Sequence, residues 1–111
     1  MNQLEILVKA RDLIKDPKNW CQQALAKDVY GTSVNVLSEE AHSFCALGAI
    51  CKITSTDRFE PSVRDAVKTL GFNWSGDLEN LNDETLTRHD RIMVYFDKAI
   101  NKLRSNHEND A

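Results

Sequence analysis

The sequence predicts an all-α fold: a compact five-helix orthogonal bundle around a central apolar helix, with one long ordered loop. Apolar residues recur at helical spacing in several segments, and one of these segments is apolar on every side. The chain has 111 residues, 41% of them hydrophobic and 28% charged, with only 4 Gly and 2 Pro, which is typical of one globular domain. We expect this domain to span residues 1–104 and a polar C-terminal tail to occupy residues 105–111.

Two helices are expected in the first part of the chain. Residues 4–14 carry apolar side chains every three or four positions, which predicts an amphipathic helix. The first helix is expected to end at Asp16, because the residue before a proline disfavours helix. A second helix is expected to start at Pro17, since proline suits the first turn of a helix, with Asp16 as its N-cap. The apolar edge of this second helix would consist of two pairs spaced four apart, Trp20 with Ala24 and Cys21 with Leu25.

The third expected helix is the central one. Residues 28–36 are expected to form a loop or a two-residue strand fragment. Ser38 followed by two glutamates then predicts a capped helix over residues 39–53. Residues 44–51 have no polar stripe, so other helices should surround them. Gly48 costs about 1 kcal/mol of helix propensity relative to Ala, so we expect another backbone to approach closely there.

Two more helices flank the long loop. Residues 61–70 begin with Pro and carry an apolar inner face, and residues 87–104 carry the best-defined apolar stripe. Thr87 with Asp90 resembles a capping box at the start of the last helix. Residues 72–86, between the two helices, lack a convincing period but contain large apolar side chains, which predicts an ordered loop.

Charge and cysteine content narrow the classes of partner. The net charge is −3, and no Lys/Arg run exceeds two residues, so direct nucleic-acid binding and a membrane-surface helix are not expected. The N-terminus lacks a signal-peptide pattern and no apolar run approaches about 20 residues, which predicts a cytoplasmic protein without a membrane partner. The three cysteines, Cys21, Cys45 and Cys51, lie in apolar patterns typical of buried thiols.

Cysteine chemistry is the enzymatic alternative. On the predicted central helix, His42 and Cys45 lie three residues apart, close enough for the imidazole to lower the pKa of the thiol. Cys45 also lies in the most apolar octet of the chain, where a free cysteine usually packs in the core. No pair has the C-x-x-C or H-x-x-x-H spacing of a zinc site, and nucleotide-binding glycine motifs are absent, so we expect neither a metal nor a cofactor.

A binding site is the leading interpretation. Asn82 and Asp83 can cap the following helix, or they can converge with other polar and aromatic residues into a cleft beside the central helix. Acidic charge concentrates near the long loop at Asp77, Glu79, Asp83 and Glu84, either as a solvated surface or as an acid/base carboxylate pair. It suggests a partner with a basic patch. The predicted binding residues are Trp20, Gln22, Trp74, Asp77, Asn82 and Asp83.

Three blocks of residues resemble a known family. They are W-x-Q-x-A-L-A-x-D from Trp20, C-A-L-G-A-I from Cys45, and Asn82-Asp83 followed by Thr87. In this order, over residues 4–103, they resemble small bacterial and phage proteins classed as a domain of unknown function. Where that family commonly has Trp, this chain has Phe44 and Leu81, which alters any aromatic wall those positions would form.

The resemblance carries no activity. We therefore expect a non-enzymatic binding module for a protein partner or a small ligand, with a cysteine-dependent enzyme using Cys45 and His42 as the alternative. A phage setting, which the resemblance permits, would suit an inhibitor of a host protein, including a defence protein.

Overall fold

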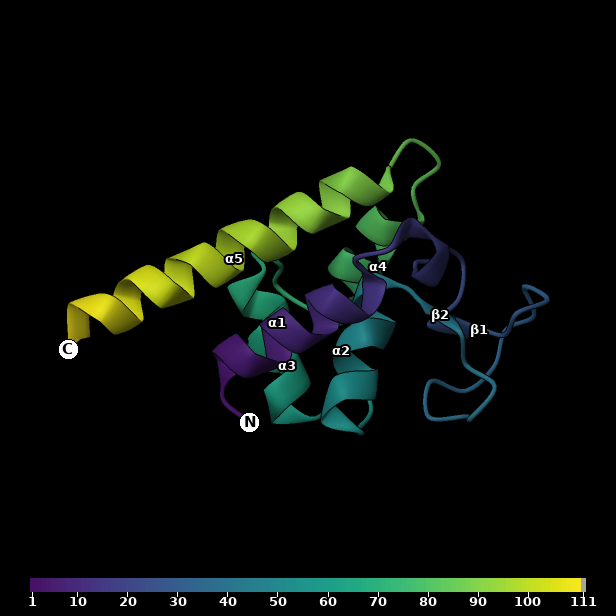
Figure 1. Cartoon of the computed structure of the whole chain (residues 1–111), viewed down its shortest axis with the longest axis horizontal. Coiled ribbons are helices and arrows are strands. Elements are labelled where there is room, and N and C mark those ends of the chain that lie inside the picture. The colour runs from purple at the N-terminus through teal and green to yellow at the C-terminus, as the bar shows by residue number, and fades with distance from the viewer. Residues whose placement is uncertain (111) are drawn as a thin grey trace.

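The computed structural model describes residues 1–110 of the chain, with side chains up to residue 106. This part of the chain forms a mostly helical globule with five α-helices and a small two-stranded hairpin, which confirms the predicted fold class (Figure 1). None of these helices combines the length and apolar character needed to cross a bilayer. In chain order the elements are α1 (Gln3–Ile14), η1 (Pro17–Asn19), β1 (Ala26–Lys27), β2 (Ser43–Phe44), α2 (Ala46–Thr54), α3 (Pro61–Thr69), α4 (Ser75–Asp83) and α5 (His89–Asp110).

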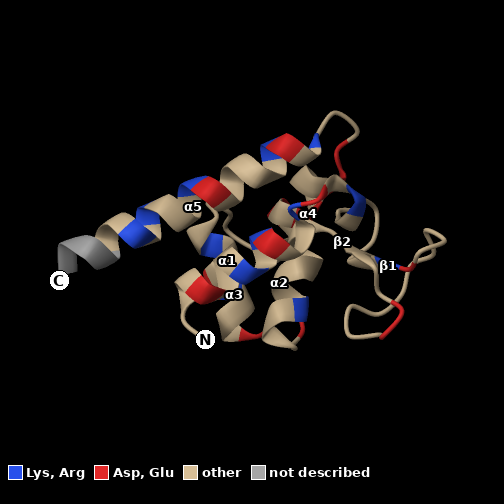
Figure 2. Ribbon diagram, viewed as in Figure 1, with Lys and Arg blue, Asp and Glu red and all other residues tan. Residues whose placement is uncertain are grey.

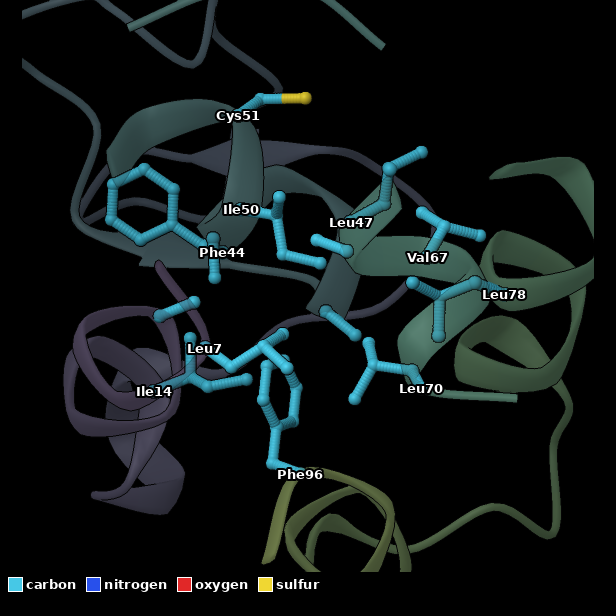
Figure 3. Close-up of a cluster of buried hydrophobic side chains, with 14 of the residues drawn as sticks. Leu7, Ile14, Phe44, Leu47, Ile50, Cys51, Val67, Leu70, Leu78 and Phe96 are labelled. Carbon is cyan, nitrogen blue, oxygen red and sulfur yellow. The ribbon is translucent and has the colours of Figure 1, made fainter. Parts of the chain in front are cut away.

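Helix α2 is the central element. All six residues from Ala46 to Cys51 are buried, and α2 packs against α1, α3 and α4. Side chains from these helices and from α5 point toward one another in the core (Figure 3). The apolar segment therefore has the surrounded position that its lack of a polar stripe predicts. Labelled members of this core include Leu7 and Ile14 of α1, Leu47 and Ile50 of α2, Val67 of α3, Leu78 of α4 and Phe96 of α5.

The start predicted for the central helix is wrong. Helix α2 begins at Ala46 with Cys45 as its N-cap, and the Cys45 Sγ accepts a hydrogen bond from the Gly48 N–H at 3.2 Å. Ser38 closes a local turn instead, because its Oγ accepts the N–H of Glu40 at 3.1 Å. Between these points, β2 pairs antiparallel with β1, so strand pairing satisfies backbone groups that a helix would have used.

The predicted second helix is also wrong. Asp16 does cap at this point, accepting the Lys18 N–H at 3.0 Å, but only the 3₁₀ turn η1 follows. Trp20 is extended and forms a parallel bridge with Phe44. Gln23 has a φ of 70°, in the left-handed region, which no α-helix contains. Pairing with the distant β2 therefore replaces the local apolar spacing as the determinant of this segment.

The long loop predicted over residues 72–86 is mostly a helix. Helix α4 occupies Ser75–Asp83, and its N-cap, Trp74, makes no side-chain capping bond, so the usual start signal is absent. The long irregular segment lies instead between β1 and β2, over residues 28–42, at the end of the molecule opposite the C-terminus of α5 (Figure 1).

Helix α5 differs from its prediction at both ends. It begins at His89, and among the described residues the buried Thr87 Oγ1 has no hydrogen-bond partner, so the predicted capping box does not form. The helix continues through residues 105–110, which were expected to be tail, and Ala111 lies outside the described residues. Arg11 of α1 pairs with Asp97 of α5 at 3.1 Å and joins the two helices at the surface.

Gly48 has the close backbone contact that its position predicts. A Cβ at this residue would collide with the carbonyl oxygen of Leu25 and lie 2.8 Å from the carbonyl carbon. The same carbonyl accepts a hydrogen bond from the Cys45 N–H at 3.1 Å, so it cannot move aside without losing that bond. The segment before β1 therefore lies directly on α2.

We predict that Gly48→Ala destabilises the fold by roughly 1–3 kcal/mol, because the added methyl group displaces the Leu25 carbonyl. The sign of the change in unfolding free energy distinguishes this contact from helix propensity. The higher helix propensity of Ala would by itself stabilise α2 by about 1 kcal/mol. Urea unfolding followed by circular dichroism measures the difference. A variant as stable as the natural chain would contradict the close approach.

Candidate functional site

Asn82 joins three segments of the chain through its side-chain amide. Its Oδ1 accepts hydrogen bonds from the Trp20 Nε1–H at 2.8 Å and from the Ala46 N–H at 3.0 Å. Its Nδ2 donates to the Cys21 carbonyl at 3.1 Å and to the Asp83 carboxylate at 3.0 Å. Asn82 is fully buried, and it caps α2 rather than the helix that follows it in the sequence.

Two glutamines complete this junction from the other side. Gln22 Nε2 donates to the carbonyls of Asn82 at 2.9 Å and Glu84 at 3.1 Å. Gln23 donates its backbone N–H to the Asp83 carboxylate and its side-chain amide to the Asp83 carbonyl, both at 2.9 Å. These bonds satisfy carbonyls at the C-terminal end of α4, which has no further helical turn to pair with them.

Four of the six predicted binding residues therefore converge, but on one another. The Trp20 ring also makes an edge contact with His89, with ring centroids 5.8 Å apart. Trp20, Gln22, Asn82 and Asp83 line none of the three hollows described below, which all lie within the described residues. Each of the four side chains makes at least one internal hydrogen bond, so this cluster, called the Asn82 junction below, ties the end of α4 to α2 and to the segment around Trp20.

The two remaining predicted residues lie at the other end of α4. Trp74 is 62% exposed, and its ring covers Gly76, where a Cβ would collide with the indole. Asp77 is half-buried in the first turn of α4, where a carboxylate complements the positive end of the helix. Phe44 and Leu81, the two positions where the resemblance implies Trp in the family, are both buried.

The predicted Cys45–His42 pair does not share a helix. His42 precedes β2 and is exposed, whereas Cys45 is buried at the N-cap of α2. Burial raises the pKa of the Cys45 thiol to about 12, against a smaller lowering by the hydrogen bond from Gly48. A catalytic cysteine needs the opposite shift. In the part of the chain that the structure describes, no three His, Cys, Asp or Glu side chains are grouped to hold a metal ion.

A hollow of about 520 Å³ opens between residues 33–37 and residues 56–59. We call it the apolar groove. Leu37 and Phe59 on its walls are 48% and 74% exposed, and Cys51 lies at the edge of the core cluster beside it (Figure 3). The groove is lined by Leu25, Ser33, Val34, Asn35, Val36, Leu37, Cys51, Thr56, Asp57, Arg58 and Phe59.

A second hollow, of about 210 Å³, adjoins the groove and shares Arg58 and Phe59 with it. We call it the basic hollow, because its charged lining residues are all cationic. Its lining consists of Arg58, Phe59, Arg64, Lys68, Asn73, Trp74 and Ser75. A third hollow, of about 330 Å³, is acidic and is lined by Asp28, Val29, Tyr30, Glu39, Glu40, Ala41 and His42.

Of the residues predicted for binding, only Trp74 lines one of these hollows. Sequence reasoning missed Phe59, although an aromatic side chain in the polar stretch T-S-T-D-R-F-E-P is a usable signal of an exposed contact residue. It also missed residues 33–37, because the groove forms only when this loop lies against the end of α2.

The structure thus defines a small helical domain with a buried polar junction and an apolar surface groove. The chain belongs to DUF6197, a family of unknown function whose model matches residues 1–102. No curated protein and no solved structure matches it.

We predict that Asn82→Ala destabilises the fold by roughly 2–4 kcal/mol, since each buried donor left without an acceptor costs about 1–3 kcal/mol. Asn80→Ala is the matched control, because Asn80 lies on the same helix and is exposed. Urea unfolding compares the two variants. Equal stabilities would show that the junction does not hold the helices together.

We predict that iodoacetamide at pH 8 does not label Cys45 in the folded chain, because the thiolate is the reactive form and the raised pKa of Cys45 keeps the thiol protonated. The chain unfolded in guanidinium chloride supplies the reference rate for each cysteine. Mass spectrometry of the peptides measures labelling. A folded-state rate equal to the unfolded rate would contradict this burial and favour the cysteine-enzyme alternative.

Proposed function

We propose that this chain is a non-enzymatic binding module that holds a segment of a protein partner in the apolar groove. The observation that carries the proposal is a groove of about 520 Å³ with an apolar floor and two exposed hydrophobic walls, Leu37 and Phe59. Its volume lies in the range of binding clefts, about 300–1,000 Å³. Exposed apolar patches of this kind commonly mark interaction sites.

The first wall of the groove is held by hydrogen bonds. The Val34 N–H donates to the Ala26 carbonyl at 3.1 Å, which fixes the loop beside β1. The Leu37 N–H donates to the Asn35 side chain at 2.8 Å and closes a turn at the end of this wall. Leu37 is therefore presented by an ordered backbone although its side chain is half exposed.

The second wall is equally constrained. The Phe59 N–H donates to the Asp57 carboxylate at 2.8 Å, and Arg58 forms an ion pair with Glu79 of α4 at 2.8 Å. Thr54 and Thr56 share a hydrogen bond of 2.9 Å at the end of α2. Because both walls are already ordered, a bound segment would not have to fix them, and this preorganisation favours affinity.

The chemistry of the groove supports binding rather than catalysis. Cys51 is the cysteine among its lining residues, and burial raises the pKa of that thiol to about 11 despite the opposing effect of Arg58. The thiol is therefore protonated near neutral pH. Asp57 is engaged in the turn that positions Phe59.

Site-specific photo-crosslinking tests the proposal. Phe59→p-benzoylphenylalanine places the crosslinker on the groove wall, and Leu86→p-benzoylphenylalanine places it on a residue that is 89% exposed elsewhere. We predict one discrete protein adduct from position 59 and none from position 86 when each chain is irradiated in its natural cell. Adding Leu37→Asp to the first variant should remove the adduct, because a carboxylate disfavours apolar contacts in the groove.

Equal adducts from both positions would indicate nonspecific contact and contradict the proposal. The absence of any adduct from position 59 would also contradict it, as would an adduct that Leu37→Asp leaves unchanged. Thermal unfolding by circular dichroism establishes that each variant is folded.

A further inference from the structure

We propose that the partner segment is acidic: an apolar side chain fills the groove, and carboxylates from neighbouring positions of the same segment reach the basic hollow. This inference rests on the proposed function and specifies the chemistry of the partner. The groove and the basic hollow share Arg58 and Phe59, so one segment can occupy both.

The positive charge of the basic hollow is the reason to infer a negatively charged partner segment. The chain has a net charge of −3, and acidic and basic residues are interspersed along its helices (Figure 2). The basic hollow departs from this mixture, since Arg58, Arg64 and Lys68 line it without a carboxylate. Asn73 and Ser75 add polar groups to the same lining.

Two of these cations are free to bind a partner. Arg58 is paired with Glu79, whereas Arg64 and Lys68 are exposed and form no ion pair within the described residues. They are four residues apart on α3, which places them about 6 Å apart along the helix axis. Carboxylates two residues apart in an extended segment are about 6.6 Å apart, which matches this spacing.

The aromatic residues explain why a simple anion is not the preferred occupant. Phe59 is 74% exposed and Trp74 is 62% exposed, and they lie on the lining of the same basic hollow. The Trp74 ring packs against Gly76, and a larger residue at position 76 would displace the ring. The position of the ring is therefore set by this contact. Aromatic faces beside cations suit a peptide with both apolar and acidic side chains.

Two of the acidic residues that suggested a basic partner have internal roles. Glu79 is paired with Arg58, and the Asp83 carboxylate accepts hydrogen bonds from Gln23 and Asn82. These carboxylates are therefore less available to a partner than a count of acidic residues near α4 implies. In the adjoining basic hollow, Arg64 and Lys68 form no ion pair within the described residues.

A random 12-residue peptide library displayed on phage provides the probe. We expect the natural chain to enrich peptides that carry Asp or Glu two residues apart beside Phe, Trp or Leu. The Kd of an enriched peptide, measured by fluorescence anisotropy, should rise about tenfold or more for the double variant Arg64→Glu, Lys68→Glu. Replacing the acidic residues of that peptide with Lys should restore binding to the double variant.

Lys98→Glu with Lys102→Glu is the matched control. These two residues are also exposed cations four apart on a helix, and their replacement changes the net charge by the same amount. We expect this control to change the Kd by less than about twofold, because distant surface charges are screened by salt. A control variant that weakens binding as much as the test variant would overturn the proposal.

The remaining outcomes separate the two proposals. Peptides that lose binding with Phe59→Ala but carry no acidic pattern, and are indifferent to the double variant, would overturn the acidic partner and leave the groove as a binding site. Peptides indifferent to Phe59→Ala would overturn both. Self-association that the double variant abolishes, measured by sedimentation equilibrium, would make the acidic hollow of a second copy the occupant and overturn a separate partner.

Discussion

The side-chain amide of Asn82 is the interaction on which the arrangement of the helices depends. Its oxygen accepts two hydrogen bonds and its nitrogen donates two, which is the full capacity of an amide with two acceptor sites and two donors. Through these bonds the end of α4 is fixed to the start of α2 and to the segment around Trp20. The N–H groups in the first turn of α2 have no partner within the helix and lie in the core. Burying them requires an acceptor from elsewhere in the chain, such as the Asn82 oxygen.

The position of the groove follows from this junction. With the start of α2 fixed, the Cys45 N–H meets the Leu25 carbonyl, and Gly48 leaves room for that carbonyl to lie on the helix. Ala26, the next residue, bonds to Val34 and so places the first wall of the groove. A buried polar contact at one end of α2 thus determines the shape of an apolar surface near its other end.

The sequence predicts the elements that depend on local pattern. Helices α1 and α3 match the apolar periods closely, and the loss of helix propensity at Gly48 correctly indicates a backbone contact. The predictions of a second helix and of the start of α2 are wrong because Trp20 and Phe44, which are distant in the sequence, form a β-bridge. The short polar side chains of Asn82 and Asp83 indicate that they can cap a helix. They do not indicate that Asn82 caps α2, which begins 36 residues earlier in the sequence. The groove is still harder to predict from the sequence, since two loops form it only after the helices pack.

The division between internally bonded and exposed residues bears on the proposed recognition site. A polar side chain whose donors and acceptors are all satisfied inside the fold gains little from a partner, because binding would only exchange one hydrogen bond for another. Trp20 and Asn82 are in this position. Phe59 and Lys68 differ, since their apolar surface and charge face the solvent beside a preformed hollow. Binding free energy is available where internal contacts are incomplete, and in this domain that condition is met beside α3 rather than at the Asn82 junction.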